Sequence, residues 1–312
     1  MRFFASLCDK KNLIVYKDIM QIFTELNKNP NLSLALGYFD GVHLGHQAVI
    51  KGAVEYAHKN SKKSAVITFK DHPCCYLWGV CPKYILTREN RRKHIENLGV
   101  DYLYEIDFES ICNLNADEYL QNIIIKHFTP SAIFTGWNHT FGHNKRGNAE
   151  YLHQHATNYE YYEIEPKSFN NEIISSTTIR ELLTKGKIEQ ANSMLGYKFS
   201  ITGTVIEGNK IGRTIGFKTA NIKYPSELID LPFGVYDVSA NNKKAIANFG
   251  VRPTVDGHQA VLEVHILNFD EDIYGQEITI EFNRMLRPEK KFQSLEELKK
   301  QIKSDIKSIT VR

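Results

Sequence analysis

Residues 37–46 read Gly-Tyr-Phe-Asp-Gly-Val-His-Leu-Gly-His, and this stretch decides how the first half of the chain is interpreted. Residues 32–36 before it form a short apolar run of strand length. Residues 47–57 after it carry apolar side chains at helical spacing. Two histidines therefore flank a glycine where a predicted strand passes into a predicted helix.

This junction has the chemistry of a phosphate site. The first turn of a helix presents unpaired N–H groups and partial positive charge, which favour an anion. Gly45 lets the backbone approach the anion closely, and His43 and His46 can donate hydrogen bonds to it. We interpret the motif as a nucleotide phosphate site rather than a metal site. The alternative is that the glycines are ordinary turn residues and the histidines are satisfied structural groups.

The same ten residues resemble the signature of the HxGH nucleotidylyltransferases. The resemblance is strongest to the adenylyltransferase module of bacterial bifunctional riboflavin kinase/FAD synthetases. It implies catalytic roles for His43 and His46, and nucleotide binding by a set of loop residues: Gly37, Phe39, Asp40 and Gly45. Asp40 either positions a metal or the loop, or closes an Asx turn.

Composition bounds the class of protein. The chain has 312 residues, enough for two domains that each bury a core. Its net charge of +3 argues against a dedicated nucleic-acid binder, although a local basic patch stays open. No apolar run approaches the roughly 20 residues of a membrane span, and the apolar N-terminal segment is too short for a secretory signal. We expect a cytoplasmic protein with neither nucleic acid nor membrane as partner.

The chain has five cysteines, an odd number in a long sequence, which predicts reduced thiols rather than a disulfide framework. His72, Cys74, Cys75 and Cys81 leave a zinc site open, but their spacing matches no common zinc pattern. We expect unbonded thiols on a loop.

Predicted strands and helices alternate through the first half. The strands are expected at 32–36, 64–69, 102–106 and 131–135, and the helices at 87–98 and 116–127. Such alternation predicts an α/β fold with a parallel sheet covered by helices, as in Rossmann-like domains. Ligands of such sheets bind beyond the carboxyl ends of the strands, so the loops after Leu36, Phe69 and Thr135 should meet at one site.

The pattern changes after about residue 196. Short strand-like segments separated by turn signals follow one another at 199–206, 233–239, 243–248, 260–267 and 276–283, which predicts an antiparallel barrel or sandwich. A last helix is expected from Ser294, with Glu297 completing a capping box. The helical stretch 176–195 bridges the halves, and we place the two domains at 1–186 and 187–312.

Two further segments fit the adenylyltransferase resemblance. Residues 68–73 correspond to a Thr-Phe-Asp-Pro-His-Pro pattern of the family, from which Lys70 and Asp71 depart. Residues 136–142 correspond to a loop that contacts flavin and nucleotide. The resemblance implies binding by Asn138, whereas His139 stands where an aromatic residue is usual.

Residues 174–180 read Ile-Ser-Ser-Thr-Thr-Ile-Arg. A Ser/Thr cluster that opens a helix is most simply an N-cap, but the same hydroxyl and N–H groups could hold a triphosphate that Arg180 neutralises. The resemblance assigns ATP phosphate binding to Ser175, Ser176 and Thr177, and a catalytic role to Arg180. The implied reaction is attack of an FMN phosphate oxygen on the α-phosphate of ATP, with release of pyrophosphate.

Residues 203–221 resemble the riboflavin kinase signature, although the glycines alone would suggest a Gly-rich hairpin. The resemblance implies that Thr219 and Asn221 coordinate Mg²⁺ through oxygen, as a hard cation prefers. It assigns the ATP-binding loop to Gly208, Gly212, Arg213 and Gly216, together with Thr219 and Asn221. Lys218 replaces a proline of the family, and this predicts a weaker kinase.

Glu263 is the candidate general base for the riboflavin 5′-hydroxyl. Alternatively it is a solvent-facing residue of an alternating strand. The matching motifs occur in family order from about residue 30 to 308, which is more specific than any one motif.

The leading hypothesis is a bifunctional enzyme that phosphorylates riboflavin to FMN and adenylylates FMN to FAD. ATP is the co-substrate, Mg²⁺ the cofactor, and the partners are small molecules. One alternative is an FMN adenylyltransferase with a weak or inactive kinase module. The other is a flavin-sensing regulator. The presence of the candidate catalytic residues His43, His46, Arg180 and Glu263 argues against it. The oligomeric state is not predicted.

Overall fold

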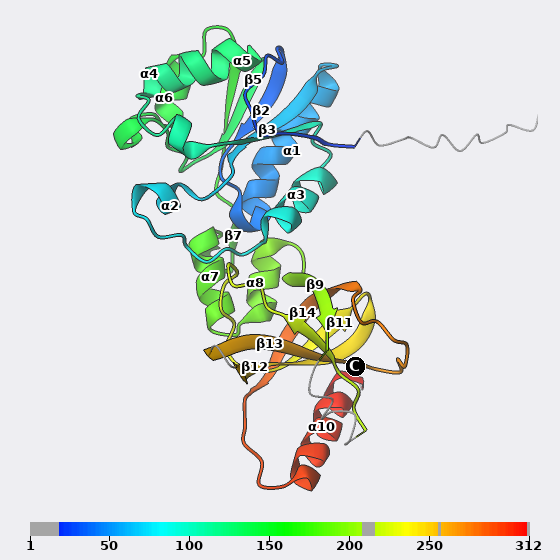
Figure 1. The fold of residues 1–312 in the computed structure, drawn as a ribbon. Helices are drawn as coiled ribbons and strands as arrows, with labels where there is room; N and C mark the ends of the chain where they lie inside the picture. The colour runs from blue at the N-terminus through cyan, green and yellow to red at the C-terminus, as the bar shows by residue number, and fades with distance from the viewer. Residues whose placement is uncertain (1–18, 208–215, 255–256, 311–312) are drawn as a thin grey trace, which may run out of the picture.

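The computed structural model describes residues 19–207, 216–254 and 257–310, and the side chains of residues 251–259 are left out of the description. The chain forms two lobes, a parallel sheet covered by helices and a barrel, with α7 and α8 between them (Figure 1). This agrees with the predicted fold class.

The first lobe is built on a six-stranded parallel sheet in the order β1-β4-β3-β2-β5-β6. Every residue of the central strand β2 is buried, as expected for a strand with helices on both faces. The strands are β1 (Gln21–Phe23), β2 (Leu32–Leu36), β3 (Lys63–Phe69), β4 (Tyr102–Ile106), β5 (Ala132–Gly136) and β6 (Glu160–Ile164).

The strand order reverses beside β2. The chain passes from β2 to β3 and β4 on one side, and then crosses to β5 and β6 on the other. Ligands of open parallel sheets bind at this kind of switch point, beyond the carboxyl ends of the strands. The loop after β2, which carries the two histidines, and the loop after β5 both begin there.

Two longer helices flank the sheet, α1 (Leu44–Lys59) and α3 (Arg88–Asn97). The predicted helix over 116–127 is less regular than expected. It consists of α4 (Ala116–Glu118), a π-helical stretch η3 (Tyr119–Ile125) and α5 (Lys126–Phe128). Its apolar side chains are nevertheless buried: Tyr119, Leu120, Ile123, Ile124 and Phe128. Shorter elements are η1 (Asp40–Val42), α2 (Pro73–Leu77), η2 (Phe108–Ser110), η4 (His143–Lys145), α6 (Ala149–Gln154), β7 (Ser168–Phe169) and β8 (Glu172–Ile173).

The second lobe is a closed antiparallel barrel in the order β10-β13-β12-β11-β14-β9. This confirms the barrel expectation over the sandwich. The sequence analysis missed one strand of this barrel, β10, whose first two residues end the segment 203–221 that was interpreted as a ligand loop or a Gly-rich hairpin. It also missed the edge strands β1 and β6 of the parallel sheet. The strands are β9 (Ser200–Ile206), β10 (Ala220–Lys223), β11 (Gly234–Ala240), β12 (Lys243–Thr254), β13 (Gly257–Ile266) and β14 (Glu277–Pro288).

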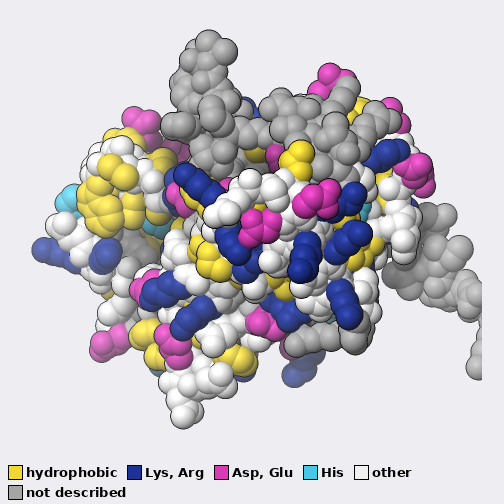
Figure 2. All heavy atoms as spheres, turned by 90° about the horizontal axis from the view of Figure 1, so that it is seen from below, with side chains coloured by type: hydrophobic (Ala, Val, Ile, Leu, Met, Phe, Trp, Pro, Cys, Tyr) yellow, Lys and Arg dark blue, Asp and Glu magenta, His cyan; other side chains and the backbone are white. Residues whose placement is uncertain are grey.

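A terminal helix, α10 (Leu295–Thr310), packs against the outside of the barrel. The Ser294 hydroxyl caps it as predicted, accepting from the Glu297 N–H at 3.2 Å. The Glu297 carboxylate accepts from Gln293, one residue before the predicted position. Basic and acidic side chains are interspersed on the face seen from below (Figure 2). Among the described residues no helix has the length and apolar character needed to span a membrane.

The predicted helical stretch 176–195 is two helices, α7 (Ser176–Thr184) and α8 (Ile188–Leu195), separated by a turn at Gly186 with φ +70°. One hydrophobic cluster runs through α7 and α8 from the sheet into the barrel. The lobes also meet at a segment, residues 83–85, which we call the strap. The Tyr84 N–H donates to the Glu227 carbonyl, and the Tyr84 carbonyl accepts from the Ile229 N–H, each at 2.8 Å.

The expectation of unbonded thiols is wrong for one pair, because Cys75 and Cys81 form a disulfide. The chain turns back after α2 through Gly79, which has φ +66°, and brings the two Cα atoms to 4.2 Å. An odd cysteine count excludes a fully paired framework but says nothing of one local pair. Cys74 and Cys112 are free, and Cys8 lies outside the described residues.

Candidate active sites

The loop after β2 is held in one conformation by close packing. Phe39 is buried and adopts a left-handed conformation with φ 60°. A Cβ at Gly37 would lie 2.8 Å from the Phe39 ring, so this position has no room for a side chain. Gly41 also has positive φ, at 75°, and faces Ile85. The predicted residues Gly37 and Phe39 therefore shape the loop through contacts with each other.

His43 is the N-cap of α1. Its Nδ1 accepts a hydrogen bond from the His46 N–H at 3.3 Å, which leaves the Nε2 of a neutral His43 as the N–H donor. A Cβ at Gly45 would lie 3.2 Å from His43 Cε1, so glycine there makes room for the imidazole. The sequence analysis explained Gly45 by backbone approach to an anion, and the structure adds this side-chain reason.

The two imidazoles stack with ring centroids 3.6 Å apart, and the edge of Phe39 meets His46 at 5.3 Å. Burial lowers the pKa of His43 to about 4, with a smaller contribution from the Arg180 cation. Burial, His43 and Arg180 hold the pKa of His46 well below its usual value. The Nδ1 of His46 is buried without a hydrogen-bond partner among the described residues. A buried nitrogen without a partner at a candidate site fits a place that a ligand completes.

Arg180 and Asp40 form the charged part of this site. One guanidinium nitrogen of Arg180 lies 2.5 Å from the Asp40 carboxylate, and its Nε donates to the Lys83 carbonyl at 3.0 Å. Burial raises the pKa of Asp40, and the Arg180 cation opposes that rise. Asp40 also accepts from the Ile85 N–H at 3.2 Å, so it holds the loop to the strap rather than closing an Asx turn.

The N-terminus of α7 meets the same loop. Ser175 caps the helix by accepting from the Thr178 N–H at 3.1 Å, as the simplest interpretation required. The Ser176 hydroxyl donates to the Asp40 carbonyl at 2.9 Å, and Thr177 is exposed in the first turn. The structure therefore brings the Ser-Ser-Thr cluster and Arg180 against the loop of the two histidines.

An aromatic cluster beside this loop escaped the sequence analysis. The Tyr38 ring meets His72 at 4.7 Å and lies under the Arg91 guanidinium at 4.7 Å. Burial lowers the pKa of His72 to about 4, with contributions from the two arginines 180 and 91. Tyr84 of the strap lies 6.4 Å from Tyr38. Tyr38 lies inside the quoted motif. Tyr84 could not be predicted from its sequence neighbours, because only tertiary folding brings it close to Tyr38.

Asn138 is exposed in the loop after β5, at the same edge of the sheet. Its side-chain oxygen lies 3.7 Å from the position of a Cβ at Gly136. His139 is stacked on Phe141 with ring centroids 5.8 Å apart, so its imidazole packs as an aromatic residue would. Burial lowers the pKa of His139 to about 4.

The candidate residues of the second lobe lie on adjacent barrel strands. Asn221 of β10 pairs with Glu263 of β13, which pairs with Asn248 of β12. The neighbours of Glu263 in β13, Leu262 and Val264, are buried in the barrel core. Because side chains alternate along a strand, these three polar residues lie on the face opposite the barrel core, where Asn221 is buried and Asn248 and Glu263 are half-buried. The alternation that made Glu263 an ordinary surface residue also places it beside Asn221.

A cavity of about 170 Å³ opens at the end of the barrel next to this row. Thr219 and Asn221 line it, as do Val264 and Ile266 from β13 and residues 269–274 from the loop that follows. Lys218 lies on its rim and forms an ion pair with Asp270. Lys218, which stands in place of a family proline, therefore has a carboxylate partner.

Three predicted ligand residues, Gly208, Gly212 and Arg213, lie outside the described residues. Gly216 is described, with φ +88° and open space around its Cα. The Thr219 hydroxyl and the Asn221 amide are hard oxygen donors on the cavity wall, so these residues fit Mg²⁺. In the described parts of the chain, no cluster of three or more His, Cys, Asp or Glu side chains could hold a metal ion.

Comparisons with known proteins match the two lobes to two different family models. A family model described as FAD synthetase matches residues 25–178, and one described as riboflavin kinase matches residues 195–311. The bifunctional riboflavin kinase/FMN adenylyltransferase of Listeria monocytogenes is 35% identical over 292 residues, covering 91% of this chain and 91% of its own length. The protein of that name from Buchnera aphidicola is 37% identical over 293 residues, covering 90% and 94%.

A solved structure from Streptococcus pneumoniae, titled a macrolide-efflux protein, superposes with a TM-score of 0.85 and 32% identity. The match covers 93% of this chain and 99% of that one. Both lobes therefore occur together in a known fold.

Proposed function

Because the chain belongs to the bifunctional riboflavin kinase/FMN adenylyltransferase family, we propose that its two candidate sites divide two reactions between them. The protein is an enzyme that makes FMN from riboflavin and FAD from FMN, with ATP as co-substrate. The family matches over both lobes favour this over a regulator or a single-activity enzyme. What we propose here is which residues perform each step.

We assign FMN adenylylation to the first lobe. His43 and His46 donate hydrogen bonds to the α-phosphate as negative charge develops on it, together with the N–H groups that open α1. Arg180 and the Ser175–Thr177 turn hold the triphosphate. The contact that best supports this assignment is the 2.5 Å pair of Arg180 and Asp40, since it joins helix α7 to the loop that carries the two histidines. Asp40 is a positioning residue that acts through Arg180.

We assign riboflavin phosphorylation to the barrel. Glu263 accepts the proton of the riboflavin 5′-hydroxyl, whose oxygen then attacks the γ-phosphate of ATP and displaces ADP. Thr219 and Asn221 would hold Mg²⁺, which when bound shields phosphate charge. The apolar part of the cavity wall suits the flat adenine ring of ATP.

Further parts of this proposal rest on the sequence. We place the functional domains at 1–186 and 187–312 and take the partners to be riboflavin, FMN and ATP. A cytoplasmic location stays a prediction.

One incubation tests the proposal. With riboflavin, ATP and Mg²⁺, chromatography should show FMN appearing first and FAD second. Chelating divalent cations before ATP is added should stop both steps. Formation of FAD from supplied FMN without any conversion of riboflavin would contradict the kinase assignment.

A further inference from the structure

The disulfide closes a loop over residues 75–81 that projects from the first lobe. Cys81 is exposed and Cys75 is half-buried, so Cys81 is the member of the pair that is more open to solvent. Between them, Trp78 and Val80 are 71% and 68% exposed. The disulfide is thus an accessible link within an exposed loop, not a buried part of the core.

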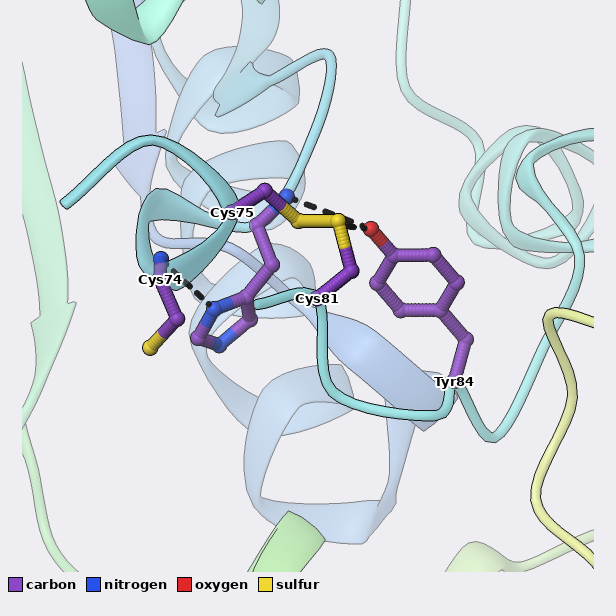
Figure 3. Close-up of a disulfide and its surroundings, with 5 residues drawn as sticks. Cys74, Cys75, Cys81 and Tyr84 are labelled. Carbon is purple, nitrogen blue, oxygen red and sulfur yellow. Dashed lines mark hydrogen bonds between the residues drawn. A yellow bond between two sulfur atoms is a disulfide. The ribbon is translucent and has the colours of Figure 1, made fainter. Parts of the chain in front are cut away.

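The loop is joined to the adenylylation site through Tyr84. Cys75 Sγ lies 3.4 Å from the Tyr84 hydroxyl, and the same hydroxyl accepts from the His72 N–H at 3.5 Å. The His72 ring in turn caps α2 by accepting from the Cys74 N–H at 3.1 Å (Figure 3). Cys75, His72 and Tyr84 form one contact group, and the disulfide fixes its position relative to Cys81.

The strap carries this group to the charged centre. The Lys83 carbonyl accepts from Arg180, and the Ile85 N–H donates to Asp40. Cys81 lies two residues before Lys83, so the disulfide restrains the chain directly ahead of the atoms that hold the Arg180–Asp40 pair.

We propose that Cys75 and Cys81 are a thiol–disulfide exchange site whose oxidised form supports FMN adenylylation by restraining the strap. The second clause rests on the proposed function of the first lobe, whereas the exchange itself does not. In a reducing compartment a disulfide is rare and is usually transient, catalytic or redox-sensing. The exposed Cys81, the short closed loop and the contact with the strap fit that use.

The exchange partner is a low-molecular-weight dithiol or its disulfide. A thiolate of the dithiol attacks the sulfur of the exposed Cys81 and forms a mixed disulfide, and Cys75 leaves as a thiolate that takes a proton from water. The second thiolate of the reagent then displaces Cys81 and closes the reagent's own disulfide. Two electrons pass to the protein, which gains two thiols, and oxidation reverses each step.

The first test counts thiols in the full-length protein. We would equilibrate it with reduced and oxidised dithiothreitol at graded ratios, trap thiols with a maleimide and weigh the product. Reduction should add two labels per chain in a single two-electron transition. Cys81→Ser should abolish the transition, and the matched control Cys112→Ser should keep it. A label count independent of the ratio would overturn the exchange site.

The second test follows adenylylation of supplied FMN by the same equilibrated samples. Loss of the restraint should slow it about tenfold on reduction, by loosening the positioned groups. Riboflavin phosphorylation should stay within twofold. The unsubstituted protein is used, so a folding defect of a variant cannot produce the result. Equal adenylylation rates in both redox states would overturn the coupling, whereas absence of adenylylation in both would overturn the proposed function.

Discussion

The candidate site of the first lobe buries its titratable groups, whereas the candidate site of the second lobe has them half-buried or exposed on the outside of a barrel. His43 and Asp40 are 5% and 3% exposed, and each is fixed by backbone contacts. In the barrel, Glu263 is half-buried on the outer face, and Lys218 and Asp270 lie at the rim of a cavity. The first site is a set of hydrogen-bond donors that the fold holds in place. The second site is a carboxylate beside a cavity.

This difference fits the reactions that we propose for the two lobes. Adenylylation needs no proton acceptor in the protein, so fixed donors around the α-phosphate suffice. Phosphorylation of a hydroxyl needs a proton acceptor within reach, and Glu263 is the carboxylate that we propose for that role. Changes at the two sites should therefore separate cleanly in their effects.

The largest effect is expected from Glu263→Gln. An amide cannot accept the hydroxyl proton, so riboflavin phosphorylation should fall by roughly 10² to 10⁴. Adenylylation of supplied FMN should be unchanged. The control is Glu277→Gln, at an exposed position of β14. Equal kinase rates in Glu263→Gln and the parent enzyme would remove the residue from its role.

His43→Ala should have the reverse effect, with adenylylation impaired and the kinase intact. Loss of a donor to developing charge costs about a hundredfold in rate, so FAD formation from FMN should drop by that factor. The kinase rate, followed as FMN from riboflavin, should hold. His58→Ala, exposed at the far end of the same helix α1, is the matched control. A drop in both activities would mean that the variant disturbs the fold rather than one site.

Lys218→Pro should have a smaller effect, in the opposite direction. Proline fixes φ just before Thr219 and removes the ammonium that pairs with Asp270. We expect kinase turnover to rise a few-fold and adenylylation to stay constant. Lys218→Ala removes the charge without fixing the backbone and so separates the two causes. A kinase rate lowered by both changes would show that the ion pair with Asp270 supports the site.

The smallest effect concerns stability and pH. The pKa values of His43 and His72 lie near 4 in the folded lobe, against 6.5 in an unfolded chain. The unfolded state therefore binds more protons between these pH values, so stability is full above about pH 6.5 and is lost as pH falls towards 4. Each histidine contributes a slope of about 1.4 kcal/mol per pH unit.

Urea unfolding between pH 4.5 and 7 measures that slope. His43→Asn should lower the slope by about 1.4 kcal/mol per pH unit, which is the contribution of one histidine. His58→Asn should leave the slope unchanged. A slope that is the same in the parent and in His43→Asn would mean that His43 is not held neutral by burial.

The comparison also explains what the sequence could predict. Four of the six sheet strands in the first lobe followed from apolar runs, and β2 and β4 have the predicted bounds, whereas the edge strands β1 and β6 were not predicted. Ser175 was recognisable as a cap because its partner Thr178 is three residues away. Such features depend on neighbours along the chain.

Features set by tertiary folding were not predictable in the same way. The Arg180–Asp40 pair joins residues 140 positions apart, and the strap reaches the barrel at Glu227. β10 was not predicted because it is a short strand at the end of the segment 203–221, and its pairing with β9 and β13 is set by the closed barrel. The Cys75–Cys81 disulfide was missed because composition cannot show the turn that brings the two cysteines together.

The most direct test of two separate sites in one chain is to mix two variants that each lack one of the two activities. His43→Ala alone should convert riboflavin to FMN and stop, and Glu263→Gln alone should leave riboflavin unchanged. Together, with riboflavin, ATP and Mg²⁺, they should form FAD, because FMN released by the first variant is adenylylated by the second. Chromatography of the flavins over time gives the answer. FAD from the mixture supports two separate sites, one for each reaction. A mixture that accumulates FMN without FAD would contradict this.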